Sequence, residues 1–321
     1  MTGRAFDFDT ELDEMHRAVF SVLPEKLLDL SDISVTRAGL DELMSQMPSP
    51  ELPPNISVED VHVPGLDGDP DVLVKVYSPN DLSAESPGLL WIHGGGMVLG
   101  SASMDDASCA AMADQHNCVV VSVDYRLAPE SPFPAPLHDC YAALKWFAEN
   151  STDLNVSPDR IAIGGASAGG GLAAGTALMA RDNAGPSLTF QLLVFPMLDH
   201  RNETPSSFGI SDTRVWNREA NITAWAAYLD GADSQTLYNM VCEGMTSRLE
   251  VTQELLRILG LEKKIKLTSV DSDFFQEEYF VKRPDSERLV NKKLNLRQMN
   301  IMRDWRISLK EYLEDYYEGF L

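Results

Sequence analysis

Short runs of apolar residues alternate with segments of helical spacing along the first two thirds of the chain. Runs rich in β-branched residues predict strands, and apolar residues at every third or fourth position predict helices. The predicted strands cover residues 61–65, 72–77, 89–93, 119–125, 160–164 and 188–196. The predicted helices lie within residues 7–47 and at residues 138–150 and 168–180. Strands that alternate with helices indicate an α/β fold, in which a mostly parallel sheet is covered on both faces.

The composition changes abruptly near Ser234. Residues 1–234 contain 27 alanines and a net charge of −22, whereas residues 235–321 contain no alanine and a net charge of −1. The pattern after the change predicts strands at residues 236–241 and 264–270, a helix at residues 247–259 and a final helix. We therefore expect two stretches of different origin, joined near Ser234.

The overall charge and composition exclude several classes of function. A net charge of −23 over 321 residues disfavours nucleic acid and anionic lipid as partners. No apolar run approaches the roughly 20 residues that cross a membrane, and residues 1–9 lack the pattern of a signal peptide. The four cysteines show no C-x-x-C spacing, which favours reduced thiols and a cytoplasmic protein. No cluster has metal-ligand spacing, so we expect neither a metal nor a cofactor.

Two glycine-rich motifs carry the candidate chemistry. Residues 165–169 read Gly-Ala-Ser-Ala-Gly between a predicted strand and a predicted helix, with Gly165 and Gly169 on either side of Ser167. Small residues at this position allow a strained turn that exposes the serine hydroxyl. Residues 93–96 read His-Gly-Gly-Gly after another predicted strand, and amides in such a run can face a developing oxyanion. Together the motifs favour acyl transfer by a serine, although the first also suits an anion-binding helix N-terminus.

The order and spacing of several motifs resemble one branch of a known family. The motifs are HGGG at residues 93–96, DYRLAPE at 124–130, FPAP at 133–136, GASAGG at 165–170 and FPMLD at 195–199. Residues 1–234 are similar to the hormone-sensitive-lipase-like α/β-hydrolases, a branch that includes carboxylesterases. The family usually carries Asp where Ala166 stands, which alters the support of the turn but not the nucleophile.

The resemblance implies an organisation and a set of roles. Residues 1–50 would form N-terminal cap helices, 51–204 the hydrolase core and 205–234 a cap insertion. Ser167 would be the nucleophile, and the amides of Gly95, Gly96 and Ala168 would form the oxyanion hole. His93 and Gly94 would shape the loop rather than transfer protons. Trp216, Trp225 and Tyr228 would line the substrate pocket, although packing of an amphipathic helix explains them equally well.

Residues 235–321 resemble a different family. The sequence VKRPDS at residues 281–286 and the blocks that follow it are similar to the C-terminal segment of extended short-chain dehydrogenases, close to dTDP-4-dehydrorhamnose reductases. We expect this β-α-β-α segment to complete the sheet. That family's nucleotide-binding fingerprint is absent, so the resemblance implies no NAD(P) and no reductase activity. That family also carries a Tyr-x-x-x-Lys motif. Tyr141 and Lys145 have this spacing, but they lie in the hydrolase part and we interpret the match as chance.

The remaining members of a catalytic triad are hard to place. In this fold the order is Ser, then Asp or Glu, then His, yet no histidine follows His200. Glu243 stands near the expected acid position, whereas the turn at residues 269–274 offers only carboxylates where the base belongs. His200 is the candidate base, and a surface loop position is its alternative explanation. His138 opens a helix and is expected to pack or cap.

The sequence therefore predicts a carboxylic ester hydrolase that acts on short acyl esters through an acyl-serine intermediate. Its partner would be a small-molecule ester, without nucleic acid or a membrane span, and a homodimer is compatible with the sequence. Two alternatives stay open. One is a catalytically impaired chimera that lacks the triad histidine, and the other is a sugar-nucleotide-binding module formed by residues 235–321.

Overall fold

The computed structural model describes residues 12–46, 51–83, 85–210, 212–232, 248–261, 264–266 and 304–316. The chain forms two compact units, Met1–Ala232 and Asp233–Leu321. In the described ranges, no helix is long and apolar enough to cross a membrane.

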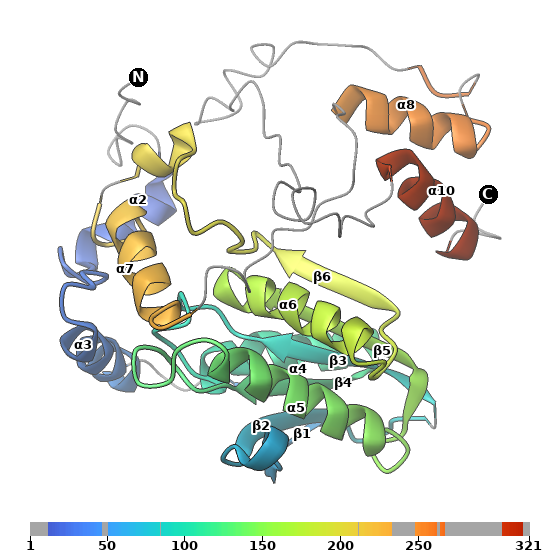
Figure 1. Ribbon diagram of the computed structural model, residues 1–321, viewed down its shortest axis with the longest axis horizontal. Helices are drawn as coiled ribbons and strands as arrows, with labels where there is room; N and C mark the ends of the chain where they lie inside the picture. Colours follow the sequence, from blue (N-terminus) through green and yellow to red (C-terminus); the bar gives the residue numbers. More distant parts are fainter. Residues whose placement is uncertain are drawn as a thin grey trace. The chain divides into compact units, whose positions relative to one another are not determined.

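A six-stranded sheet forms the centre of the first unit (Figure 1). Its strands are β1 (Ile56–Val63), β2 (Val72–Pro79), β3 (Ser86–Ile92), β4 (Val119–Asp124), β5 (Val156–Ala166) and β6 (Phe190–Val194). They lie in the order β1-β2-β4-β3-β5-β6. Strand β2 runs antiparallel to both β1 and β4, and the other neighbours are parallel. The predicted α/β fold with a mostly parallel sheet is confirmed.

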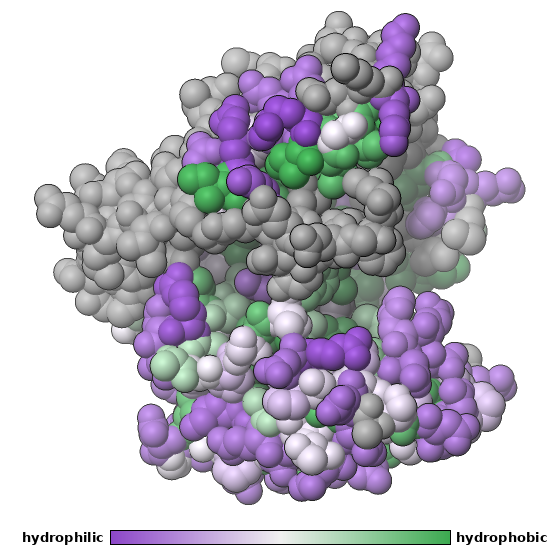
Figure 2. Space-filling view, turned by 90° about the vertical axis from the view of Figure 1, so that its right-hand side faces the viewer, coloured by the Kyte–Doolittle hydropathy of each residue, from purple (hydrophilic) through white to green (hydrophobic). Residues whose placement is uncertain are grey.

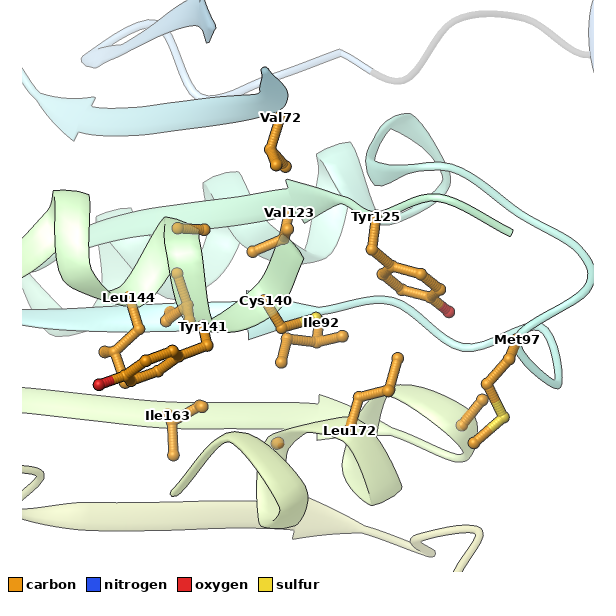
Figure 3. Close-up of a cluster of buried hydrophobic side chains, with 14 of the residues drawn as sticks. Val72, Ile92, Met97, Val123, Tyr125, Cys140, Tyr141, Leu144, Ile163 and Leu172 are labelled. Carbon is orange, nitrogen blue, oxygen red and sulfur yellow. The ribbon is translucent and has the colours of Figure 1, made fainter. Parts of the chain in front are cut away.

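Helices cover both faces of the sheet because the central strands are apolar on both sides. On one face α4 (Asp106–His116) packs against Tyr77, Trp91 and Val120. The opposite side chains of the same strands join α5 (Ala135–Glu149) and α6 (Ala168–Asp182) in the larger core. Figure 3 shows part of this core, where Ile92, Val123 and Ile163 meet Cys140, Leu144 and Leu172. The sequence pattern did not predict α4.

Three further helices of the first unit lie beyond the sheet (Figure 1). They are α2 (Glu14–Val22), α3 (Ile33–Gln46) and α7 (Arg218–Tyr228). The 3-10 turns are η1 (Leu66–Gly68), η2 (Ala102–Asp105) and η3 (Pro205–Phe208). The Leu28 N–H donates to the Thr213 carbonyl at 2.7 Å, which ties the segment between α2 and α3 to the segment before α7. Arg37 of α3 donates to the carbonyls of Val98 and Ala128. The assignment of these helices to a cap stays a prediction.

The second unit contains two described helices, α8 (Arg248–Ile258) and α10 (Trp305–Tyr316), which pack against each other. Leu256 and Trp305 are the buried apolar residues there. The predicted strand at 264–270 is wrong at residues 264–266, which form a turn after α8, and residues 267–270 lie outside the described ranges. The predicted strand at 236–241 also lies outside them.

Polar and charged residues cover most of the coloured surface in the lower part of Figure 2. The chain as a whole carries a net charge of −23.

Among the described residues, one carboxylate is buried in the core. The Asp139 side chain is 1% exposed and accepts hydrogen bonds from the side chain and the backbone N–H of Arg126. Arg126 also pairs with Asp69, whose carboxyl pKa it holds below the usual range. These contacts hold the segment after β4 against α5.

The Arg126 guanidinium compensates a buried charge, so its removal is expected to be costly. Arg126→Met leaves the Asp139 carboxylate buried without its cation, and we expect a loss of about 3 to 5 kcal/mol in the free energy of unfolding. Urea denaturation measures this change. Arg181→Met is the matched control, because Arg181 and Asp182 form an exposed pair, 46% and 62% exposed, that contributes at most about 1 kcal/mol. Equal effects of the two substitutions would contradict this account.

Candidate active site

Ser167 lies between β5 and α6 in a strained backbone conformation. Its φ is 54° and its ψ is −116°, a region that residues with a side chain seldom adopt. The Ser167 N–H donates to the Val194 carbonyl at 2.9 Å, and its own carbonyl accepts from the Met197 N–H at 2.8 Å. The end of β5 and the residues after β6 therefore hold the turn in place.

Glycines make this turn possible because backbone groups approach it closely. A methyl group on Gly169 would lie 1.9 Å from the Ile92 carbonyl oxygen, and one on Gly165 would lie 2.5 Å from the backbone of Gly169. Neither contact can be relieved by moving a side chain. The strand-turn-helix arrangement predicted for residues 161–180 is present, and it leaves the Ser167 side chain partly exposed.

The glycine-rich loop after β3 lies beside this turn. A methyl group on Gly94 would be 3.6 Å from Ser167 Cβ. Gly95 and Gly96 have φ values of 111° and 65°, which suit glycine. Within the described residues, the N–H groups of Gly95, Gly96 and Ala168 donate no hydrogen bond. Three backbone donors thus remain available on the two segments that meet at Ser167.

The buried side chain of His93 supports the loop at residues 93–96. Its side chain is 1% exposed, its Nδ1 lies 2.7 Å from the Gly94 carbonyl oxygen, and its ring stacks on Tyr125 at 4.2 Å. The Tyr125 hydroxyl donates to the His93 carbonyl at 3.0 Å. Burial lowers the pKa of the His93 imidazole, which keeps the ring neutral. These contacts fit a bracing role.

A pocket of about 350 Å³ opens beside Ser167. Its apolar lining includes Phe195, Met197, Leu198, Ile210 and Trp216. Its polar lining includes Asp199, Asn202, Asn217, Arg218 and Asn221. Trp216 also packs on the glycine-rich loop at residues 93–96, because a methyl group on Gly96 would lie 2.0 Å from its ring. Trp225 and Tyr228 are not among the lining residues and instead are buried in the core.

None of the six histidines of the chain forms a hydrogen bond with the Ser167 hydroxyl in the described structure. His16 pairs with Asp13, and the Nδ1 of His138 lies 3.5 Å from Asp69. His62 and His116 are exposed. His200 is exposed too, lies outside the pocket lining and packs edge-to-face on Trp225 at 6.1 Å between ring centroids.

Carboxylates near the site are already engaged. Asp199 lines the pocket and accepts hydrogen bonds from Arg201 at 2.7 Å, which lower the pKa of its carboxyl group. Glu243, the candidate acid, lies outside the described residues. In the described part of the chain, no group of three or more His, Cys, Asp or Glu side chains is arranged to hold a metal ion.

Sequence reasoning missed several pocket residues. Asn202, Arg218 and Asn221 come from the segment between β6 and the first turns of α7. The family resemblance assigned residues 205–234 to a cap insertion but named neither Arg218 nor Asn221 as a pocket residue. The contacts among these residues arise from tertiary folding, and their spacing in the sequence does not predict them.

The close contact at Gly169 should make this position intolerant of a side chain. We expect Gly169→Ala to lower the free energy of unfolding by about 1 to 3 kcal/mol or more, since the added methyl meets backbone. Gly39→Ala in α3 is the control, because nothing lies within 4 Å of the added methyl there, and alanine is expected to stabilise the helix by about 1 kcal/mol. Thermal unfolding of both variants measures the difference. A harmless Gly169→Ala would refute the close approach.

Comparison with known proteins identifies relatives of this arrangement. A family model described as alpha/beta hydrolase fold matches residues 89–257, beyond Ser234, where we expected the hydrolase pattern to stop. The carboxylesterase NlhH of Mycobacterium tuberculosis is 37% identical over 223 residues, which cover 70% of this chain and 69% of that protein. The esterase LipI of the same species is 36% identical and covers 68% of this chain and 67% of its own.

A solved structure agrees with these relatives. The bacterial heroin esterase superposes with a TM-score of 0.62 at 40% identity, and the match covers 68% of each chain. The resemblance of residues 235–321 to short-chain dehydrogenases stays a prediction. The strained serine turn, the glycine-rich loop and the relatives agree, and the chain belongs to the α/β-hydrolase family, in its hormone-sensitive-lipase-like branch of carboxylic ester hydrolases.

Proposed function

We propose that the chain hydrolyses small carboxylic esters with short acyl groups, with Ser167 as the nucleophile. The observation that carries the proposal is the position of Ser167 in a strained turn beside three backbone N–H groups without partners. The relatives named as carboxylesterases and esterases support it. A pocket of about 350 Å³ is at the small end of ligand sites, which favours short acyl chains.

The proposed reaction has two steps. Ser167 Oγ forms a bond to the ester carbonyl carbon while its proton passes to a base, and the amides of Gly95, Gly96 and Ala168 stabilise the resulting oxyanion. Collapse of this intermediate releases the alcohol, which takes up a proton. Water then attacks the acyl-serine, releases the carboxylic acid and restores the hydroxyl. The sugar-nucleotide alternative gains no support from the relatives described above.

The proposed mechanism needs a base that accepts the Ser167 proton. In the described residues no histidine forms a hydrogen bond with the Ser167 hydroxyl, and His200 is the histidine nearest in sequence to the pocket lining. Positioning and an oxyanion hole without a complete triad still accelerate such reactions about 1000- to 10,000-fold over water. That residual rate is also what remains when the serine itself is removed, so formation of the acyl-serine still depends on a group that accepts the Ser167 proton.

We also propose that the protein works in the cytoplasm. Cys109, Cys118 and Cys140 are buried free thiols, and burial raises the pKa of each. Buried thiols of this kind are typical of proteins in a reducing compartment.

Turnover of p-nitrophenyl acetate and p-nitrophenyl butyrate tests the proposed function. We expect Ser167→Ala to lower kcat/KM by at least about 100-fold, because the acyl-serine can no longer form. Release of p-nitrophenol measures the rate, and circular dichroism checks that the variant is folded. Turnover that is equal in the two proteins, or absent from both, would overturn the proposal and leave an inactive hydrolase fold.

Added imidazole tests for the missing base. A positioned base accelerates such a reaction by about 100- to 10,000-fold. Free imidazole that enters the pocket should recover part of this acceleration and raise turnover at least about tenfold. The same titration with Ser167→Ala gives the background reaction of imidazole with the ester. An unresponsive wild-type protein combined with an inactive His200→Ala variant would contradict this expectation and identify His200 as the base.

A further inference from the structure

Arg218 is a cation in the lining of the Ser167 pocket. It is the first residue of α7, and Asn217 caps that helix by accepting from the Ala220 N–H at 2.9 Å. The Arg218 guanidinium lies over the Phe208 ring, 4.3 Å from its centroid, and Nη2 donates to the Asn202 carbonyl at 3.4 Å. These contacts orient the guanidinium at the pocket, at the end of α7 where the helix dipole is positive.

The charge of Arg218 is left without a counterion. Its Nε is buried and has no hydrogen-bond partner, and no carboxylate of the described residues forms an ion pair with it. The neighbouring arginines differ, since Arg201 pairs with Asp199 and Arg214 pairs with Asp212, each at 2.7 Å. A buried polar group without a partner is rare in native proteins and calls for an explanation.

The surrounding groups leave this charge for a ligand. Asp199 is the carboxylate of the lining, and Arg201 already occupies it. Asn202 and Asn221 are neutral and bond to each other through their side chains, while the Trp216 indole donates to Asn221 at 3.1 Å. The polar side of the pocket therefore presents one uncompensated positive charge among neutral groups.

We propose that Arg218 binds a carboxylate of the substrate, so that the esters preferred by this pocket are anionic. This inference rests on the proposed esterase function and names its substrate class. Two kinds of ester carry a free carboxylate. One is a monoester of a short dicarboxylic acid, and the other is a short hydroxy acid whose hydroxyl group is acylated. A partly buried guanidinium attracts a carboxylate more strongly than a solvated one, because less water screens the pair.

The net charge of −23 opposes the approach of an anion to this protein. That repulsion acts through solvent, so salt screens it over about 8 Å at physiological ionic strength. The contact with Arg218 is partly buried and is screened less. Selectivity for anionic esters should therefore persist at high salt, where the repulsion of the surface is suppressed.

Paired substrates test the proposal. Monoethyl glutarate carries the carboxylate on its acyl part, and ethyl 5-methylhexanoate replaces that carboxylate by an isopropyl group of similar shape. Butanoyloxyacetate carries the carboxylate on its alcohol part, with isobutyl butyrate as its neutral partner. We expect Arg218→Gln to lower the ratio of kcat/KM for the anionic to the neutral ester by about 10- to 100-fold in one of these pairs.

Two further variants control this test. Arg218→Lys keeps the charge and should retain most of the ratio, which guards against a folding defect in Arg218→Gln. Arg214→Gln removes an arginine of the segment before α7 that pairs with Asp212 and does not line the pocket. It should leave the ratio as in the wild-type protein. A ratio that is unchanged by Arg218→Gln in both pairs would refute the proposal.

Calorimetry separates this inference from the proposed function. Monoethyl glutarate and butanoyloxyacetate are each titrated into Ser167→Ala and into Ser167→Ala combined with Arg218→Gln. We expect the second substitution to weaken binding of one anion about 10-fold or more. Arg218-dependent binding with no turnover would defeat the proposed function and retain the anion site. Equal binding of both anions to the two proteins would overturn the site whatever the turnover.

Discussion

The close approach of α6 to the end of β3 is the contact on which the site depends. Gly169 lies against the carbonyl of Ile92, the last residue of β3, with no room for a methyl group. Helix α6 begins directly after Ser167, and β3 leads directly into the loop at residues 93–96. One backbone contact therefore fixes both Ser167, the proposed nucleophile, and the loop that carries the proposed oxyanion donors. The strain at Ser167 persists because hydrogen bonds to Val194 and Met197 hold the turn from the other side.

Two carboxylates in the core and at the pocket have an arginine partner, whereas the arginine of the pocket lining has no ion-pair partner among the described residues. Asp139 is buried but bonded to Arg126, and Asp199 is held by Arg201. Among the described residues, Arg218 has no such counterion, and no histidine forms a hydrogen bond with the Ser167 hydroxyl. The described residues thus bring together a serine and three backbone N–H groups without partners, as the proposed acyl transfer requires, and the described histidines form no hydrogen bond with the Ser167 hydroxyl.

The sequence predicted the parts of the structure that depend on local pattern. The sheet, α5, α6 and the turn at Ser167 follow from apolar periodicity and from glycines at fixed spacing. Helix α4 was missed because its buried residues are Cys109, Ala110 and Ala113, which are too small to give a clear apolar stripe. Arg218 was missed because its environment is set by Phe208 and Asn202, which reach it only through tertiary folding. The resemblance placed Trp216, Trp225 and Tyr228 at the pocket, yet two of them are core residues.

The nucleophilic role of Ser167 is the central claim, and trapping of the acyl-enzyme tests it most directly. The protein is mixed with p-nitrophenyl butyrate, quenched in acid and digested, and the peptides are examined by mass spectrometry. The account predicts a butyryl group on the peptide that contains Ser167, at a level well above that on any lysine peptide. The Ser167→Ala protein should lack this modification and keep the lysine background. A wild-type protein with no butyryl group on Ser167, or with the same modifications as Ser167→Ala, would contradict the account.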